Sequence, residues 1–202
     1  MKNYLKVKNV LDKILALILL IVLFPLMLIM GIIIKMESKG PVIFIQDRLG
    51  YRGEPFKFYK FRSMAKESEN RGSGVYSFKG DPRITRFGRI IRAASLDELP
   101  QLWNILKGEM GFIGPRPTLI NHPWPLEEYT DFQKNRFTVR PGVTGLAQIN
   151  GRREILWKER IEWDVKYIHT MSFKMDLYIL YKTSGIVFGN RGNHNIKKTD
   201  EK

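Results

Sequence analysis

Twenty-one consecutive uncharged residues near the N-terminus place the strongest constraint on this chain. The run extends from Ile14 to Ile34 and ends at Lys35. A bilayer core needs about 20 apolar residues in a helix, so the segment is long enough to span it. The apolar core of a signal peptide is usually shorter, about 7–15 residues, and ends at a small-residue cleavage site, which we do not find here. The sequence therefore favours a permanent membrane anchor.

Pro25 lies near the middle of this run, and Phe24 precedes it. Proline removes a helical hydrogen bond and clashes with the preceding turn, so we expect the helix to kink or break there. Both flanks are basic, and positive flanks prefer the cytoplasm. We therefore favour a re-entrant segment with both ends on the cytoplasmic side. The alternative is one kinked span with the N-terminus outside.

Composition narrows the kinds of partner and chemistry. Lys and Arg exceed Asp and Glu by 14 in 202 residues, which points to an anionic partner such as a phosphorylated substrate, anionic lipid or nucleic acid. The chain has no Cys, which excludes disulfides, thiolate nucleophiles and Cys-ligated zinc. The three His show no metal-ligand spacing, and no known nucleic-acid-binding motif is present.

The remainder of the chain predicts an α+β domain. We expect a membrane segment over residues 1–38, a domain over 39–188 and a disordered polar tail over 189–202. Patterns predict strands at 41–46 and 56–64, a turn at 50–53, a mobile loop at 65–80, and amphipathic helices within 155–188. These last helices would either close the core or lie at the headgroup level, and we assign part of their surface to the membrane. Alternation in the second strand places Lys60 and Arg62 on one face, where they would reach a site or, as we prefer from the strand alone, only end the strand in solvent.

Asp97 and Glu98 are adjacent carboxylates at the predicted start of a helix. Ser95 and Glu98 match the capping-box pattern, which would explain both residues without any function. An Asp in a first helical turn is also common, because negative charge there suits the helix dipole. Arg residues recur every third position before the pair and end at Arg92, which makes a basic stripe if that segment is helical.

Three features favour catalysis over capping alone. A helix N-terminus with Arg nearby suits a phosphate, and Asp97 would stay ionised there, as a nucleophile must. Glu98 would point elsewhere and hold a cation; Mg²⁺ suits one or two carboxylates with substrate phosphates. Pro115 and Pro117 fix the backbone around Arg116, which favours a pre-positioned guanidinium for a phosphate.

A Gly-containing segment from Arg140 to Arg152 is the last candidate part of the site. Its glycines permit a ligand to approach the backbone, and Arg140, Gln148 and Arg152 are placed to reach a phosphate or base. A turn followed by a short strand explains the same pattern and is compatible with that role.

The motifs together resemble the bacterial sugar transferases, and more narrowly the small monotopic phosphoglycosyl transferases. The resemblance rests on Leu-Asp-Glu-Leu-Pro-Gln-Leu-Trp-Asn around Asp97, on Gly-Pro-Arg-Pro, and on Arg-Pro-Gly-Val-Thr-Gly-Leu-Ala-Gln from Arg140. It covers nearly the whole chain, from the apolar segment to about Lys182. In the family's re-entrant helix the break lies at a proline matching Pro25, often after Ser, where this chain has Phe24.

The resemblance implies a reaction and roles for the residues. Such enzymes move a sugar-1-phosphate from a UDP-sugar to a polyprenyl phosphate, usually undecaprenyl phosphate, release UMP, and initiate a glycan. Asp97 would be the nucleophile and Glu98 the Mg²⁺ ligand. The phosphate-binding set would be Lys60, Arg92 and Arg116, to which we add Arg140; weaker candidates for nucleotide binding are Pro115, Pro117, Thr144 and Gln148. The enzyme would lie on the cytoplasmic face of the bacterial inner membrane, among lipids, and would not bind nucleic acid; a homo-oligomer and the identity of the sugar are left open.

Two hypotheses from other classes stand beside this one. A membrane-anchored basic protein that binds nucleic acid or anionic lipid would explain the charge and the anchor, but not the carboxylates or the Pro-Arg-Pro turn. A structural subunit that tethers partners through its amphipathic helices is the other.

Overall fold

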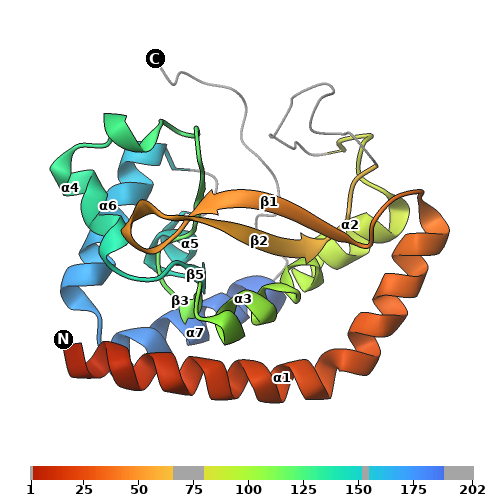
Figure 1. Ribbon diagram of the computed structural model, residues 1–202, viewed down its shortest axis with the longest axis horizontal. Coiled ribbons are helices and arrows are strands. Elements are labelled where there is room, and N and C mark those ends of the chain that lie inside the picture. The colour runs from red at the N-terminus through yellow and green to blue at the C-terminus, as the bar shows by residue number, and fades with distance from the viewer. Residues whose placement is uncertain (1, 66–79, 152–154, 189–202) are drawn as a thin grey trace.

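A computed structural model describes residues 2–65, 80–151 and 155–188. Predictions for the loop at 66–79, for Arg152 and for the tail at 189–202 fall outside the described residues. The structure is α+β, as expected, with helices around two small sheets (Figure 1). The α-helices are α1 (Lys2–Glu37), α2 (Arg86–Ala93), α3 (Gln101–Lys107), α4 (Asp131–Lys134), α5 (Leu146–Asn150), α6 (Trp157–Thr170) and α7 (Phe173–Phe188). The strands are β1 (Ile43–Leu49), β2 (Pro55–Phe61), β3 (Gly111–Ile113), β4 (Thr118–Leu119) and β5 (Gly142–Thr144), and short 3-10 turns are η1 (Tyr51–Gly53), η3 (Leu96–Glu98), η4 (Leu126–Glu128) and η5 (Asn135–Thr138).

The apolar run lies in α1, which remains helical through Pro25. Among the described residues, α1 is the one helix long and apolar enough to cross a membrane. Figure 1 shows it running beneath the domain and then turning upward toward the start of β1. The helix therefore bends but is not interrupted, because a single proline costs one hydrogen bond and neighbouring turns can continue.

Side chains from both halves of α1 are buried against the domain. Ala16 is fully buried in a cluster with Phe58 of β2. Met30 and Ile34 are buried in a second cluster with Phe61, the last residue of the same strand. Many of the other large apolar side chains of α1 are exposed. The helix thus packs on the domain along its length and presents an apolar outer face.

Arg62 caps the C-terminal end of α1 and does not reach the candidate site. Its Nη2 donates to the carbonyl oxygens of Ile34 and Ser38, at 3.2 and 2.6 Å. The last carbonyls of a helix lack intrahelical partners, so a buried guanidinium there satisfies them. Of the two basic residues that alternation placed on one face, only Lys60 approaches the carboxylates.

The three-stranded sheet has the order β2-β1-β4, and β3 pairs with β5 in parallel. Both predicted strands exist, although β1 ends three residues later than expected and β2 three residues earlier. Asn104 of α3, which is fully buried, covers the outer edge of β2. Its Nδ2 donates to the Lys57 carbonyl at 2.6 Å, and its Oδ1 accepts from the Tyr59 N–H at 3.2 Å. This amide satisfies edge groups that would otherwise be unpaired, and it fixes α3 beside β2.

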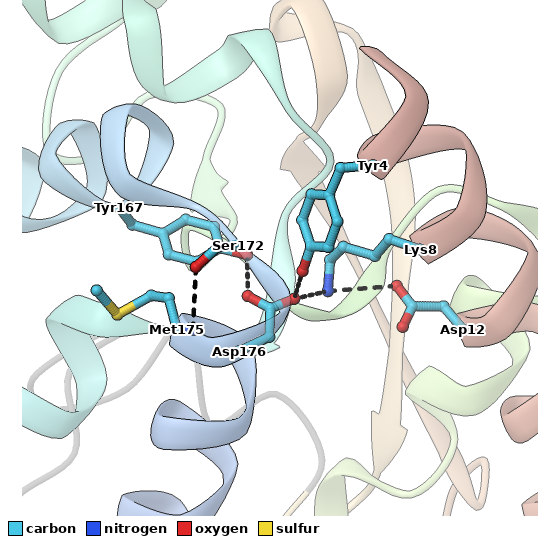
Figure 2. A network of polar contacts seen from close by, with 7 residues as sticks. All are labelled: Tyr4, Lys8, Asp12, Tyr167, Ser172, Met175 and Asp176. Atoms are coloured by element: carbon cyan, nitrogen blue, oxygen red, sulfur yellow. Dashed lines mark hydrogen bonds and ion pairs between the residues drawn. The ribbon is translucent and has the colours of Figure 1, made fainter. Parts of the chain in front are cut away.

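A polar network joins the first turns of α1 to the C-terminal helices (Figure 2). The carboxylate of Asp176 on α7 accepts from the Tyr4 hydroxyl, the Lys8 ammonium and the Tyr167 hydroxyl, each at 2.7 Å. Lys8 also lies 3.7 Å from Asp12. The N-terminal helix α1 and the two consecutive C-terminal helices α6 and α7 therefore meet at one buried carboxylate.

The two C-terminal helices confirm the helical prediction for 155–188. One of them closes the core, and the other exposes an apolar face. The inner face of α6 buries Ile161, Val165 and Ile168. By contrast, α7 exposes a set of large apolar side chains: Phe173, Leu177, Tyr178, Leu180 and Tyr181. Core packing therefore accounts for much of α6, whereas α7 retains an exposed apolar face.

Candidate active site

Asp97 and Glu98 lie in the 3-10 turn η3, before the α-helix that was expected to carry them. Pro100 has no N–H and separates η3 from α3, which begins at Gln101. Ser95 has a left-handed backbone (φ 57°) and makes no capping hydrogen bond. The capping-box interpretation is therefore wrong, and so is the idea that the dipole of a regular helix end forms the anion site.

Glu98 forms a short ion pair with the arginine of the Pro-Arg-Pro turn. The Arg116 Nη2 donates to Glu98 Oε1 at 2.6 Å, and both side chains are partly buried. The guanidinium thus lies at the carboxylate pair although 18 residues separate the two in sequence.

Lys60 and Arg92 complete the surroundings of Asp97. Burial raises the pKa of Asp97 to about 6, the charge of Glu98 adds to the increase, and Lys60, Arg92 and Arg116 oppose it. The environment therefore raises this pKa, where we expected a helix end to hold it down. Asp97 is still mostly ionised at neutral pH, because about 6 lies below 7.

The ammonium of Lys60 is also perturbed. Burial lowers its pKa to about 8; the charges of Arg48 and Arg92 contribute, while Asp97 and Glu98 act in the opposite direction. Three cationic side chains, Lys60, Arg92 and Arg116, thus act on the carboxylate pair, an excess of positive charge that suits a multiply charged anion.

The Pro-Arg-Pro turn is fixed at each of its three carbonyl oxygens. Pro115 O accepts from the Gly142 N–H at 2.9 Å. Arg116 O accepts from Arg136 Nη2, and Pro117 O from Arg48 Nη1, each at 2.8 Å. Different elements supply the three donors, so the turn has little freedom to shift.

The weaker candidates lie around this turn. Thr144 O accepts from the Gly114 N–H at 2.9 Å, and its hydroxyl lies 2.7 Å from that of Thr183. Gln148 lies beside Gly145, which itself is in close contact with Gly114 O. Their assignment to nucleotide binding stays a prediction.

Arg140 lies apart from the cluster. It is close to Gly108, the C-cap of α3, and its charge acts on Asp12 of α1. The seven residues of α3, about 10 Å of helix, separate that end from η3. Arg86 and Arg89 of the basic stripe are exposed, whereas Arg92 acts on Asp97.

Sequence reasoning did not identify Arg48, Arg136 or Asp164 as parts of the site. Arg48 also lies over the ring of Phe58, 4.9 Å from its centroid. Arg136 forms a buried ion pair with Asp164 of α6 at 2.8 Å. None lies within a recognisable motif, and the hydrogen bonds that join Arg48 and Arg136 to the Pro-Arg-Pro turn and to Asp164 connect positions 20 to 69 residues apart, so no local signal marks them.

The similarity of this chain to known proteins extends over the residues that form the site. The profile of the family described as bacterial sugar transferase matches residues 3–190. This chain belongs to the bacterial sugar transferase family. Over 195 residues it is 43% identical to a UDP-glucose:undecaprenyl-phosphate glucose-1-phosphate transferase of Xanthomonas campestris pv. campestris, covering 94% of this chain. It is 43% identical over 160 residues, 79% of this chain, to the uncharacterized sugar transferase EpsL of Bacillus subtilis (strain 168).

A third relative carries a different sugar in its name. The chain is 40% identical over 183 residues, 89% of its length, to a UDP-N-acetylgalactosamine-undecaprenyl-phosphate N-acetylgalactosaminephosphotransferase of Aeromonas hydrophila. The chain spans 40% of the Xanthomonas relative, 43% of the Aeromonas relative and 76% of the Bacillus relative. The region shared with these sugar transferases contains the carboxylate pair and the cations around it.

Proposed function

We propose that this sugar transferase moves a sugar-1-phosphate from a UDP-sugar to a polyprenyl phosphate, undecaprenyl phosphate in the names of its relatives, and releases UMP. The observation that carries the proposal is the carboxylate pair among three cations, Lys60, Arg92 and Arg116, with Arg116 bonded to Glu98. The names of the relatives support the donor and acceptor classes. Because those names differ in the sugar, we assign only the class of donor. The product would begin the assembly of a surface or glycoprotein glycan.

In the first step an Asp97 carboxylate oxygen attacks the sugar-bearing phosphorus. The new P–O bond forms as the bond to the UMP phosphate breaks, leaving a phosphosugar on Asp97. In the second step an oxygen of the polyprenyl phosphate attacks the same phosphorus and the aspartyl P–O bond breaks. Two displacements allow a water-soluble donor and a lipid acceptor to use one site in turn.

Lys60, Arg92 and Arg116 hold the donor diphosphate in the first step, and the phosphosugar and acceptor phosphates in the second. Arg116 is bonded to Glu98 in the described structure, so an incoming phosphate must share its guanidinium. A planar guanidinium has a second edge for this purpose. These residues hold the reacting phosphorus close to Asp97 and offset the negative charge on the departing UMP.

Glu98 would hold Mg²⁺. The donor chemistry fits, since Mg²⁺ typically uses one or two carboxylates together with waters and substrate phosphates. When bound, the ion would offset negative charge on the diphosphate and on UMP. Among the described residues no group of three or more His, Cys, Asp or Glu gathers into a larger site, so the substrate would supply part of the coordination.

We further propose that α1 enters and leaves the membrane on one side, with the domain on the cytoplasmic face of the inner membrane. Lys8 binds Asp176 of the domain at 2.7 Å, while the other end of α1 is capped by Arg62 of the same domain. A transmembrane span would separate these two ends by a hydrocarbon core of about 30 Å. The basic flanks of α1 and the exposed apolar face of α7 support the same arrangement. A single Cys introduced at Asn3 should be labelled from the cytoplasmic side. Labelling only from the periplasmic side would exclude the re-entrant topology.

A burst experiment tests the chemistry. Without acceptor, the wild-type protein should release about one UMP per active site and gain the mass of a phosphosugar, as expected for a covalent intermediate. Asp97→Asn should show neither burst nor turnover while keeping its membrane binding. Asp131→Asn is the matched control, because Asp131 is an exposed Asp in the first turn of α4. Normal turnover by Asp97→Asn would exclude Asp97 as the nucleophile.

A further inference from the structure

A buried ion pair lies directly behind the Pro-Arg-Pro turn. Arg136 of η5 and Asp164 of α6 are 3% and 2% exposed, and Arg136 Nη2 lies 2.8 Å from Asp164 Oδ2. The same nitrogen donates to the carbonyl oxygen of Arg116, also at 2.8 Å. One guanidinium therefore joins α6 to the backbone of the arginine that meets Glu98.

Within this turn, the backbone conformation of Arg116 is less restricted by the sequence than that of the two prolines. Pro115 and Pro117 have fixed φ angles, and Pro117 restricts the residue before it to extended conformations. The orientation of the peptide group between Arg116 and Pro117 sets the direction in which the Arg116 side chain leaves the backbone. The hydrogen bond from Arg136 to the carbonyl oxygen of Arg116 fixes this orientation. A displacement there would move the guanidinium that pairs with Glu98.

Stability alone does not require a charged pair at this place. Replacement of a buried ion pair by apolar side chains of similar volume is often neutral or stabilising, whereas removal of one partner is strongly destabilising. Arg136 Nη2 donates to Asp164 and to Arg116 O, so the link from this pair to the carboxylates runs through the Arg116 backbone.

We propose that Arg136 and Asp164 are positioning residues, which hold the Arg116 backbone so that its guanidinium meets the donor diphosphate. The inference rests on the proposed transferase function. Asp164 orients Arg136, Arg136 holds Arg116 O, and Arg116 binds the phosphate. A residue on the C-terminal helix α6 thus contributes to phosphate binding without touching the substrate.

The first experiment separates stability from positioning. The double variant Arg136→Met/Asp164→Leu should keep a melting temperature near that of the wild type, because both charges leave together. Its kcat/KM for the UDP-sugar, measured as UMP release, should fall about 10²-fold, the effect of a misplacement of about 1 Å at a reacting group. A double variant with wild-type stability and wild-type kcat/KM would overturn the proposal.

The second experiment asks whether the effect passes through Arg116. In a cycle with Arg116→Ala, the double variant should add little further loss, because the side chain that it positions is already absent. The same fold-loss in both backgrounds would show independent action and overturn the proposal. If the Arg136→Met/Asp164→Leu variant does not fold, Arg136→Lys takes its place in the same double-mutant cycle with Arg116→Ala. It keeps the charge facing Asp164 but lacks the planar guanidinium, so we expect several-fold lower kcat/KM, and full activity would count against the inference.

Tyr167→Phe is the matched control on α6. Tyr167 is buried one turn from Asp164 and bonds Asp176 rather than the Pro-Arg-Pro turn. It should lower the melting temperature and leave kcat/KM unchanged. UMP release by the wild type must be established first: its absence would contradict the proposed function, whereas an active wild type with unaffected variants would contradict only the positioning role.

Discussion

Asp176→Ala should detach the first turns of α1 from the domain. Its carboxylate accepts three hydrogen bonds of 2.7 Å, from Tyr4, Lys8 and Tyr167, and is 6% exposed. The substitution leaves the half-buried Lys8 ammonium and Tyr4 hydroxyl, and the buried Tyr167 hydroxyl, without this acceptor. Removal of one partner from a buried ion pair costs about 3–5 kcal/mol. For a chain of this length each kcal/mol lowers the melting temperature by about 2–4 °C, which gives an expected decrease of about 6–20 °C.

Thermal unfolding in detergent micelles, followed by tryptophan fluorescence, measures this decrease. Asp47→Ala is the control: Asp47 also pairs with a lysine, Lys57 at 2.8 Å, but both side chains are largely exposed, and an exposed pair contributes about 0–1 kcal/mol. Lys8→Met should cost little more once Asp176 is already Ala, since the two residues share one interaction. An Asp176→Ala shift no larger than that of Asp47→Ala would refute the docking of α1 through this carboxylate.

Four further outcomes follow from the site and the fold. UMP release should decline about tenfold per pH unit below about 6, because Asp97 with its pKa of about 6 must be deprotonated to attack; a pH–rate profile measures this. The rate should also fall above about pH 8, where Lys60 loses its charge, and Lys60→Arg should remove that alkaline decline. Gly142→Ala should lower the melting temperature and UMP release together, since its Cβ would lie 2.1 Å from Gly114 N and disturb the Pro115 contact. Asn104→Leu should destabilise the protein by about 2–5 kcal/mol, measured by denaturant unfolding, because two groups at the edge of β2 lose their partner.

The raised pKa of Asp97 connects the fold to the chemistry. Exposed Asp titrates near 4, so a site at the surface would keep activity to lower pH. An acid limb near pH 4 would show that water reaches Asp97 more freely than its surroundings in the structure indicate.

Several parts of the fold were predictable because short-range patterns determine them. The length of the apolar run requires a long helix, and the β-branched and aromatic segments before and after Gly50 and Gly53 form the β1–β2 hairpin. The helical character of 155–188 followed from the spacing of its apolar residues. The start of α3 was not predictable in the same way, because Pro100 lacks an N–H and the α-helix begins only after it, at Gln101, rather than before the carboxylates.

By itself, the sequence determined the chemical groups: an apolar helix, adjacent carboxylates at Asp97 and Glu98, and an arginine between two prolines. Only the tertiary structure decided which cations reach them. Lys60 and Arg62 share one strand face by alternation, yet Arg62 caps α1 while Lys60 acts on Asp97. The shift in the pKa of Asp97 and the hold of Arg136 on Arg116 likewise depend on burial and on contacts between distant segments. Periodicity and motif spacing report on near neighbours in the chain, whereas these interactions arise only when the chain has folded.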